Sequence, residues 1–236
     1  MTHQREIISK VLSPALRFWL RSQVDATEEL QVRIEGSNRQ ILSGYIPHVF
    51  LKGIRAVYQG IHLTQVQLEG ENIRINIGQV LKGKPLQLLE PVRVTGEVRL
   101  EETDLNASLS SCLLSNAFTE LLLTLLELSG QPQPNSILEK YYLSWEKITL
   151  NTDKLTLSGT LTDAEGNVQP ITFRAGLELV NRQTLRLHPI QIEILPQLFP
   201  IALREFQVDL GTDVELEKLS LEVGQLLCSG CLTVRP

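Results

Sequence analysis

The stretch from Leu105 to Ser129 limits the possible folds more than any other part of the sequence, because leucine occupies most of its helical circumference. The only consistently polar strip of this predicted helix is narrow and consists of Asn116, Glu120, Thr124 and Glu127. Gly130 and Pro132 follow it, as is typical just beyond the end of a helix. A helix that is apolar on so many sides must be covered by other parts of the chain.

Alternating patterns precede and follow this helix. Residues 30–100 alternate apolar with polar side chains, most clearly in Ile73–Ile77 and Val92–Leu100, and the alternation returns after Gln131–Asn135. A period of two indicates antiparallel strands with one dry face and one solvated face. The predicted fold class is α+β, in helix-meander-helix-meander order, with curved antiparallel sheets wrapped around long amphipathic helices.

A further amphipathic helix is predicted over residues 5–21. Its apolar face consists of Ile7, Ile8, Val11, Leu12, Ala15, Leu16, Phe18 and Trp19. The opposite face carries a basic stripe of Lys10, Arg17 and Arg21, while Pro14 fits either two short helices or one kinked helix. The stripe is either a solvated outer face or a surface that docks on anionic headgroups, where each charge contributes ~1 kcal/mol.

Composition narrows the class of protein. The chain has 236 residues, which suits a single domain of two halves, 1–102 and 103–236. A net charge of -5 and 5% aromatic residues argue against general nucleic-acid binding, which needs cations for phosphates and rings for bases. No transmembrane helix or secretory signal is evident, and three cysteines are an odd number, so a cytoplasmic location is expected.

No motif for catalysis or metal binding stands out. Cys228 and Cys231 form a C-x-x-C pair, but a second pair and a nearby histidine are missing, and the pair falls in a predicted strand. Phosphate-loop, nucleophile-elbow and zinc-protease patterns are also missing from the sequence. We therefore expect a non-enzyme with no catalytic residue, metal or cofactor, and keep a thiol-disulfide enzyme as a remote alternative.

Sheets packed along the leucine-rich helix create an elongated apolar seam, which either side chains or a ligand must fill. The candidate acyl-chain residues are Phe18, Trp19, Leu114, Phe118, Leu121, Leu122 and Leu125. The candidate headgroup or membrane-docking residues are Lys10, Arg17, Arg21, Lys52, Arg55, Lys82 and Lys84. The apolar loop from Leu195 to Leu203 either caps the core or dips into a membrane.

Several segments, most of them between residues 41 and 116, resemble the LmeA-like phospholipid-binding family of bacteria. They are Gly44–Pro47, Tyr58–Val66, Glu69–Asn76, Val80–Leu86, Asp104–Asn106, Leu210–Thr212 and Cys231–Pro236. The resemblance implies lipid binding and a helix-and-curved-sheet fold similar to tubular lipid-binding domains. It brings no catalytic motif. Its characterised type is exported to the cell envelope, whereas no signal peptide is recognised in this sequence.

The sequence thus predicts a non-enzymatic protein that binds a phospholipid or another long-chain lipid, with peripheral contact to an anionic membrane. The alternative is a structural or protein-interaction module whose interior is filled by its own side chains. A void of ~300–1,000 Å³ beside the leucine-rich helix would favour the first interpretation.

Overall fold

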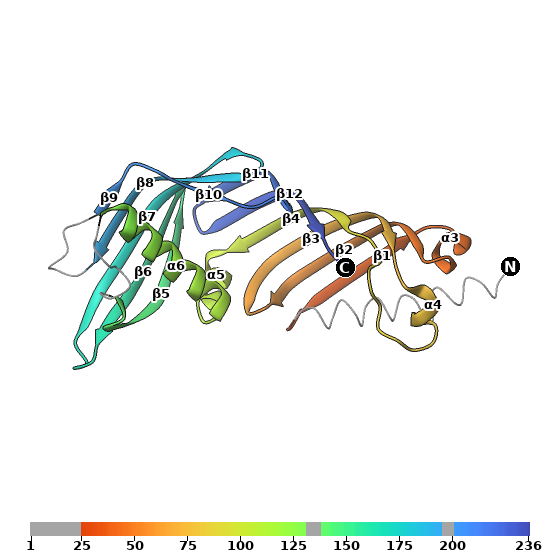
Figure 1. Ribbon diagram of the computed structural model, residues 1–236, viewed down its shortest axis with the longest axis horizontal. Coiled ribbons are helices and arrows are strands. Elements are labelled where there is room, and N and C mark those ends of the chain that lie inside the picture. Colours follow the sequence, from red (N-terminus) through yellow and green to blue (C-terminus); the bar gives the residue numbers. More distant parts are fainter. Residues whose placement is uncertain (1–24, 131–137, 195–200) are drawn as a thin grey trace.

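The structure is a computed structural model that describes residues 25–130, 138–194 and 201–236. It contains two antiparallel sheets placed end to end along the long axis of the molecule (Figure 1). The α+β class with antiparallel strands is therefore confirmed. The predicted helix 5–21, with Lys10, Arg17, Phe18, Trp19 and Arg21, lies outside the described residues, as does most of the apolar loop 195–203.

The first sheet has six strands in the order β1-β2-β3-β4-β12-β11. They are β1 (Glu29–Glu35), β2 (Tyr45–Tyr58), β3 (Ile61–Arg74), β4 (Val92–Glu101), β11 (Val214–Glu222) and β12 (Gln225–Val234). The predicted strand Val92–Leu100 corresponds to β4. The two final strands come from the far end of the chain, so the predicted halves 1–102 and 103–236 share this sheet.

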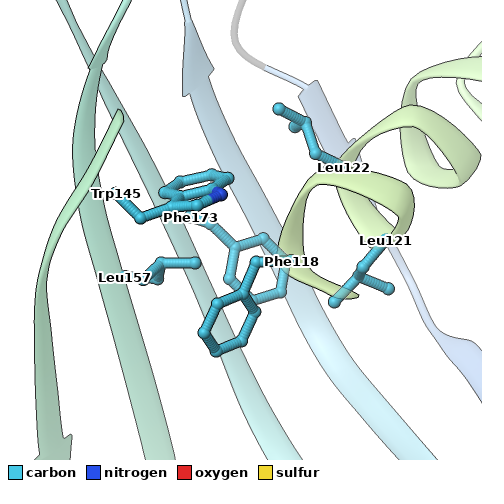
Figure 2. Close-up of a pocket in the computed structure, with 6 residues that line it drawn as sticks. All are labelled: Phe118, Leu121, Leu122, Trp145, Leu157 and Phe173. Carbon is cyan, nitrogen blue, oxygen red and sulfur yellow. The ribbon is translucent and has the colours of Figure 1, made fainter. Parts of the chain in front are cut away.

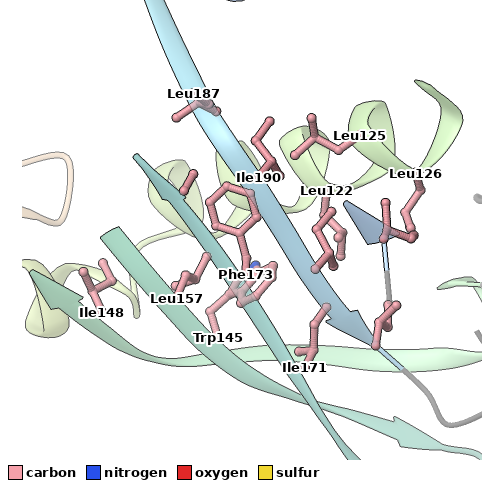
Figure 3. Packing of buried hydrophobic residues seen from close by; sticks show 14 of the residues in the cluster. Leu122, Leu125, Leu126, Trp145, Ile148, Leu157, Ile171, Phe173, Leu187 and Ile190 are labelled. Carbon is pink, nitrogen blue, oxygen red and sulfur yellow. The ribbon is translucent and has the colours of Figure 1, made fainter. Parts of the chain in front are cut away.

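The second sheet has the order β10-β8-β7-β6-β5, and β9 pairs with β8. Its strands are β5 (Tyr141–Asn151), β6 (Lys154–Asp163), β7 (Val168–Asn181), β8 (Thr184–Ile194), β9 (Ile201–Leu203) and β10 (Phe206–Asp209). One row of paired residues crosses it, and each member is at most 7% exposed: Ile148, Leu157, Phe173, Ile192 and Ile201. This sheet holds the main core of the protein (Figure 3).

The prediction of one continuous helix over 105–129 is wrong. The stretch forms α5 (Glu102–Ser108) and α6 (Cys112–Leu128), which are bent by 89° at the break. Two serines explain the break, because the Ser111 side chain caps α6 by accepting from the Leu114 N–H, and Ser108 Oγ accepts from the His62 N–H. The remaining described helices, α3 (Asn38–Leu42) and α4 (Ile77–Val80), are short.

Helix α6 packs one side against the second sheet. Leu122, Leu125 and Leu126 are at most 2% exposed, whereas Leu113 and Leu128 are 52% and 59% exposed. The expectation that this helix is covered on several sides is therefore wrong. No single helix in the described part of the chain is long and apolar enough to span a membrane, and α5 and α6 reach that length only together, across their bend.

Helix α5 joins the two sheets through side chains that pair with the edge of β5. The Asn106 amide donates to the Ile148 carbonyl at 2.9 Å and accepts from the Ile148 N–H at 2.8 Å. Glu102 accepts from the Leu150 N–H, and the Gly224 N–H of the β11–β12 turn donates to the Leu150 carbonyl. These contacts fix the first sheet against the second, because they satisfy N–H and carbonyl groups on the edge strand β5 that would otherwise lack a backbone partner.

Candidate functional site

We call one face of the first sheet the inner face. Three neighbouring rows of paired residues on this face carry apolar side chains or glycine, apart from one thiol. Cross-strand partners in a sheet point to the same side, so the register identifies each row. The rows are Leu30–Gly53–Val66–Val98–Cys228–Leu219, Val32–Leu51–Leu68–Gly96–Gly230–Leu216 and Ile34–Val49–Gly70–Val94–Leu232–Val214. An apolar surface therefore crosses all six strands.

The opposite face of the same sheet, which we call the outer face, is polar. Its rows include Gln31, Arg33, Lys52, Gln67, Glu69, Thr95, Glu97, Ser229 and Cys231. Arg93 and Glu215 form an ion pair at 2.9 Å on this side, beside Cys231. The same six strands thus carry polar side chains on one face and apolar side chains on the other, so the apolar inner face results from the alternation along each strand and from the register between strands.

Most of the inner face is only half-buried. Val66 is 8% exposed, but Val32, Leu51, Leu68 and Val98 are intermediate in exposure, and Leu232 is 37% exposed. Among the described helices that make substantial contact with this sheet, α3 packs on β2 and α5 packs on β3 and β4. The described helices thus cover the two ends of the inner face and leave its middle accessible.

Each end of the inner face runs into a hydrophobic cluster. At one end Val32, Ile34 and Val49 pack against a small cluster built from Ile41, Ile46, Ile75, Ile77, Val80 and Leu86. At the other end Leu100 and Leu226 pack against the main core. The inner face is therefore one continuous apolar track between two packed regions.

The seam between α6 and the second sheet is filled by side chains. Its cavity has a volume of about 10 Å³ and is lined by Phe118, Leu121, Leu122, Trp145, Leu157 and Phe173 (Figure 2). The rings of Phe118 and Trp145 meet edge to face with centroids 6.2 Å apart. Such a cavity is at the limit for one water molecule, so it has no room for an acyl chain.

The structure brings some of the predicted acyl-chain residues together. Phe118, Leu121 and Leu122 line the small cavity, and Leu125 is fully buried one turn further along α6. Leu114 is half-buried and packs against the same core. These residues meet where the sequence predicted a seam, but they pack against the sheet and do not line an open channel.

The four predicted headgroup residues in the described part of the chain do not lie together. Lys82 and Lys84 lie in the exposed turn after α4, near the start of β2, while Arg55 lies near the end of β2 and pairs with Glu28 at 3.6 Å. The ten residues from the start of β2 to Arg55 correspond to ~33 Å along a strand. Lys52 lies on the outer face, beside Gln31 and Gln67.

The two cysteines of the C-x-x-C pair lie on opposite faces. Cys228 sits in the first inner row and Cys231 is on the outer face, since residues three apart in a strand point in opposite directions. Burial raises the pKa of the Cys228 thiol, which disfavours the reactive thiolate. This geometry argues against a thiol-disulfide site. In the described part of the chain no three His, Cys, Asp or Glu side chains gather to hold a metal ion.

One segment of the family resemblance, Asp104–Asn106, has a structural role. Thr64 Oγ1 donates to the Asp104 carboxylate at 2.6 Å and accepts from the Glu101 N–H at 2.7 Å, which holds α5 on β3. Together with the Asn106 contacts to β5, these bonds make α5 the connection between the sheets. The inner face itself was missed by sequence reasoning, although each strand showed its alternation, because the rows appear only when the strand order is known.

The fold and this face define a class of protein: a two-sheet α+β protein with one long apolar sheet face, which is half-buried in the described part of the chain. The chain belongs to the LmeA-like phospholipid-binding family, whose sequence model matches residues 4–231. No curated protein and no solved structure matches the chain.

Proposed function

We propose that this protein is a non-enzymatic phospholipid-binding protein and that the acyl chains lie along the inner face of the first sheet. Membership of a phospholipid-binding family supports the ligand class. The observation that carries the location is the three apolar rows, which are half-buried between two packed ends. We also propose that the chain is one domain, because β11 and β12 from its far end complete the first sheet.

The size and chemistry of the inner face suit a lipid tail. Six strands span five spacings of ~4.8 Å, about 24 Å across, and the strands themselves add length in the other direction. Each methylene group removed from water contributes ~0.8 kcal/mol, so contact with several rows outweighs a few headgroup interactions. The second-sheet seam is a less suitable location, because binding there would require α6 to move off the sheet and expose Leu122 and Leu125.

Peripheral contact with an anionic membrane is part of this proposal. Among the described headgroup candidates, Lys82 and Lys84 lie near the cluster end of the inner face, whereas Lys52 faces away from it. A tubular enclosure of the ligand and a cytoplasmic location stay predictions.

The native cysteines allow a direct test. In a Cys112→Ser background, the variant Cys231→Ser leaves a thiol only on the inner face, and Cys228→Ser leaves one only on the outer face. A monomeric short-chain phospholipid should slow alkylation of Cys228 by a maleimide and leave the alkylation rate of Cys231 unchanged. Alkylation in mildly alkaline buffer compensates for the raised pKa of Cys228.

Two further variants provide a matched comparison on neighbouring residues. Leu51→Gln places an amide on the inner face and should weaken the protection of Cys228, whereas Lys52→Gln changes the outer face and should leave it intact. Equal protection of both cysteines, or none for Cys228, would contradict the proposed location.

A protein-interaction module is the second candidate function. The observation in its favour is the packed interior beside α6, whose cavity of about 10 Å³ leaves no space for a ligand. A stable stoichiometric partner, combined with unprotected Cys228 in the presence of phospholipid, would support this alternative.

A further inference from the structure

We propose that the turn after α4, Leu81–Pro85, docks on the surface of an anionic phospholipid bilayer and brings the nearby end of the inner face to the membrane. We call this turn the α4 tip. All five of its residues are exposed, and Leu81 is 49% exposed although it is a large apolar side chain. Within four positions the tip therefore presents an exposed leucine and two lysines, Lys82 and Lys84. The second part of the proposal rests on the proposed function.

The α4 tip is held in place by hydrogen bonds to its own base. The Lys82 and Lys84 N–H groups both donate to the Gln79 carbonyl, and the Gly83 N–H donates to the Val80 carbonyl. The buried Asn76 amide donates to the Pro85 carbonyl at 3.0 Å and accepts from the Gln87 N–H at 2.8 Å. A turn fixed in this way loses little conformational entropy when it meets a surface.

The residues on either side of the tip connect it to the inner face. Val80 and Leu86 are 6% and 5% exposed and belong to the small cluster on which Val32 and Ile34 of the inner face pack. The tip is thus the exposed outside of the cluster that closes one end of the apolar track. A membrane bound at the tip would lie next to that end.

The charges around the tip favour an anionic surface. None of the ion pairs within 4.0 Å among the described residues involves Lys82 or Lys84. Arg74 adds a further cation at the base of the segment, where its guanidinium lies 4.7 Å from the Tyr45 ring centroid. Residues 81–90 contain a single acid, Glu90, at their end.

A bilayer fits this surface better than a free phosphate does. A phosphate site needs several donors that converge on one point, whereas Lys82 and Lys84 are two exposed, separate side chains. Leu89 is 57% exposed and adds a second apolar side chain where the segment rejoins Arg74. Leucines that enter the interface beside lysines that meet headgroups are typical of peripheral membrane contacts.

The experiment is flotation of the full chain with vesicles of phosphatidylcholine alone and of phosphatidylcholine mixed with phosphatidylglycerol. The chain should float with the mixed vesicles. Lys82→Gln combined with Lys84→Gln should lower the affinity about 25-fold, since each lysine near an anionic surface contributes about fivefold. Leu81→Ser should lower it about tenfold, because part of the side chain enters the interface.

The matched control is Lys147→Gln combined with Lys154→Gln, two exposed lysines of the second sheet whose removal changes the net charge equally. This control should float as the wild type does. Unchanged flotation of the tip variants, or full competition by inorganic phosphate, would overturn the docking proposal.

Cysteine protection separates this proposal from the proposed function. Tip variants that lose flotation but keep protection of Cys228 by monomeric phospholipid support both proposals. A wild-type chain that fails to float but protects Cys228 overturns the α4 tip and the proposed membrane contact, and it leaves the inner-face site standing. A chain that floats through the tip without protecting Cys228 retains the docking and overturns the inner-face site.

Discussion

The two sheets carry apolar rows of similar composition, but the rows differ in how they are covered. In the second sheet Ile148, Leu157 and Ile192 are each at most 1% exposed beneath α6 and its neighbours. In the first sheet Val32, Leu51 and Leu68 occupy an equivalent row and remain half-buried. Alternation in a sequence therefore specifies that a face is apolar, while the elements packed on that face decide how far it is buried.

The largest effect should come from the covered sheet. Leu125 is fully buried on α6, so Leu125→Ala should lower the free energy of unfolding by about 2–5 kcal/mol through lost burial and a cavity. The control is Leu113→Ala on the same helix, where 52% exposure predicts a change within ~0.5 kcal/mol. Equilibrium denaturation measures both, and a similar loss in the two variants would contradict the difference in cover.

The connection between the sheets should be next in size. Asn106→Ala removes both hydrogen bonds to Ile148 and leaves a part-buried N–H and carbonyl without those partners, at a cost of about 1–3 kcal/mol. Asn116→Ala, an exposed asparagine on α6, is the matched control. Hydrogen exchange should be faster at the Ile148 amide in Asn106→Ala than in the wild type. Unchanged protection of this amide would contradict the role of α5 as the connection between the sheets.

A smaller effect is expected on the inner face. Leu68→Ala should lower the free energy of unfolding by about 1 kcal/mol, because its side chain is already partly in water. Leu157→Ala, in the buried row of the second sheet, should cost more than twice as much. If denaturant unfolding shows equal losses of unfolding free energy in the two variants, the inner face is as well covered as the main core in the second sheet.

The smallest effect concerns the polar pair Glu178–Arg186 of strands β7 and β8 in the second sheet. Hydrogen bonds from Arg186 and His188 lower the pKa of the Glu178 carboxyl below its ordinary value of 4.5. A lowered pKa in the folded state stabilises the fold above the unfolded-state value, and that stability is lost as the pH falls below 4.5 through the folded value. Glu178→Gln should therefore flatten the acid limb of stability against pH. An identical acid limb in wild type and variant would show that this exposed cluster contributes nothing.

Local signals predicted most of the strands but not their partners. The alternation in Val92–Leu100 corresponds to β4, whose neighbour β12 could not be identified, because pairing between distant strands depends on cross-strand contacts. The run Ile73–Ile77 was predicted as strand, yet β3 ends at Arg74. There the Asn76 side chain binds the returning chain at Pro85 and Gln87, and Ile77 begins α4.

The helix break carried a signal that was available in advance. Ser110 and Ser111 are typical N-cap residues in the middle of the leucine-rich stretch, and Ser111 does cap α6. The meeting of Phe118, Leu121 and Leu122 beside the sheet could also be predicted from helical periodicity. The size of the cavity that they enclose could not, because it depends on how the rings of Phe118 and Trp145 pack.

The position of β12 between β4 and β11 has a consequence for the order of synthesis. On the ribosome, β1 to β4 leave the exit tunnel well before β12. The edge of β4, with Val94 and Val98, therefore stays unpaired while the second sheet is translated, until Cys228 and Leu232 of β12 emerge. Such an open edge is a template for wrong pairing. We therefore expect a chaperone to bind the nascent first sheet at this edge. Pairing of β12 with β4 should limit the rate of folding, because it joins strands that are distant in the sequence.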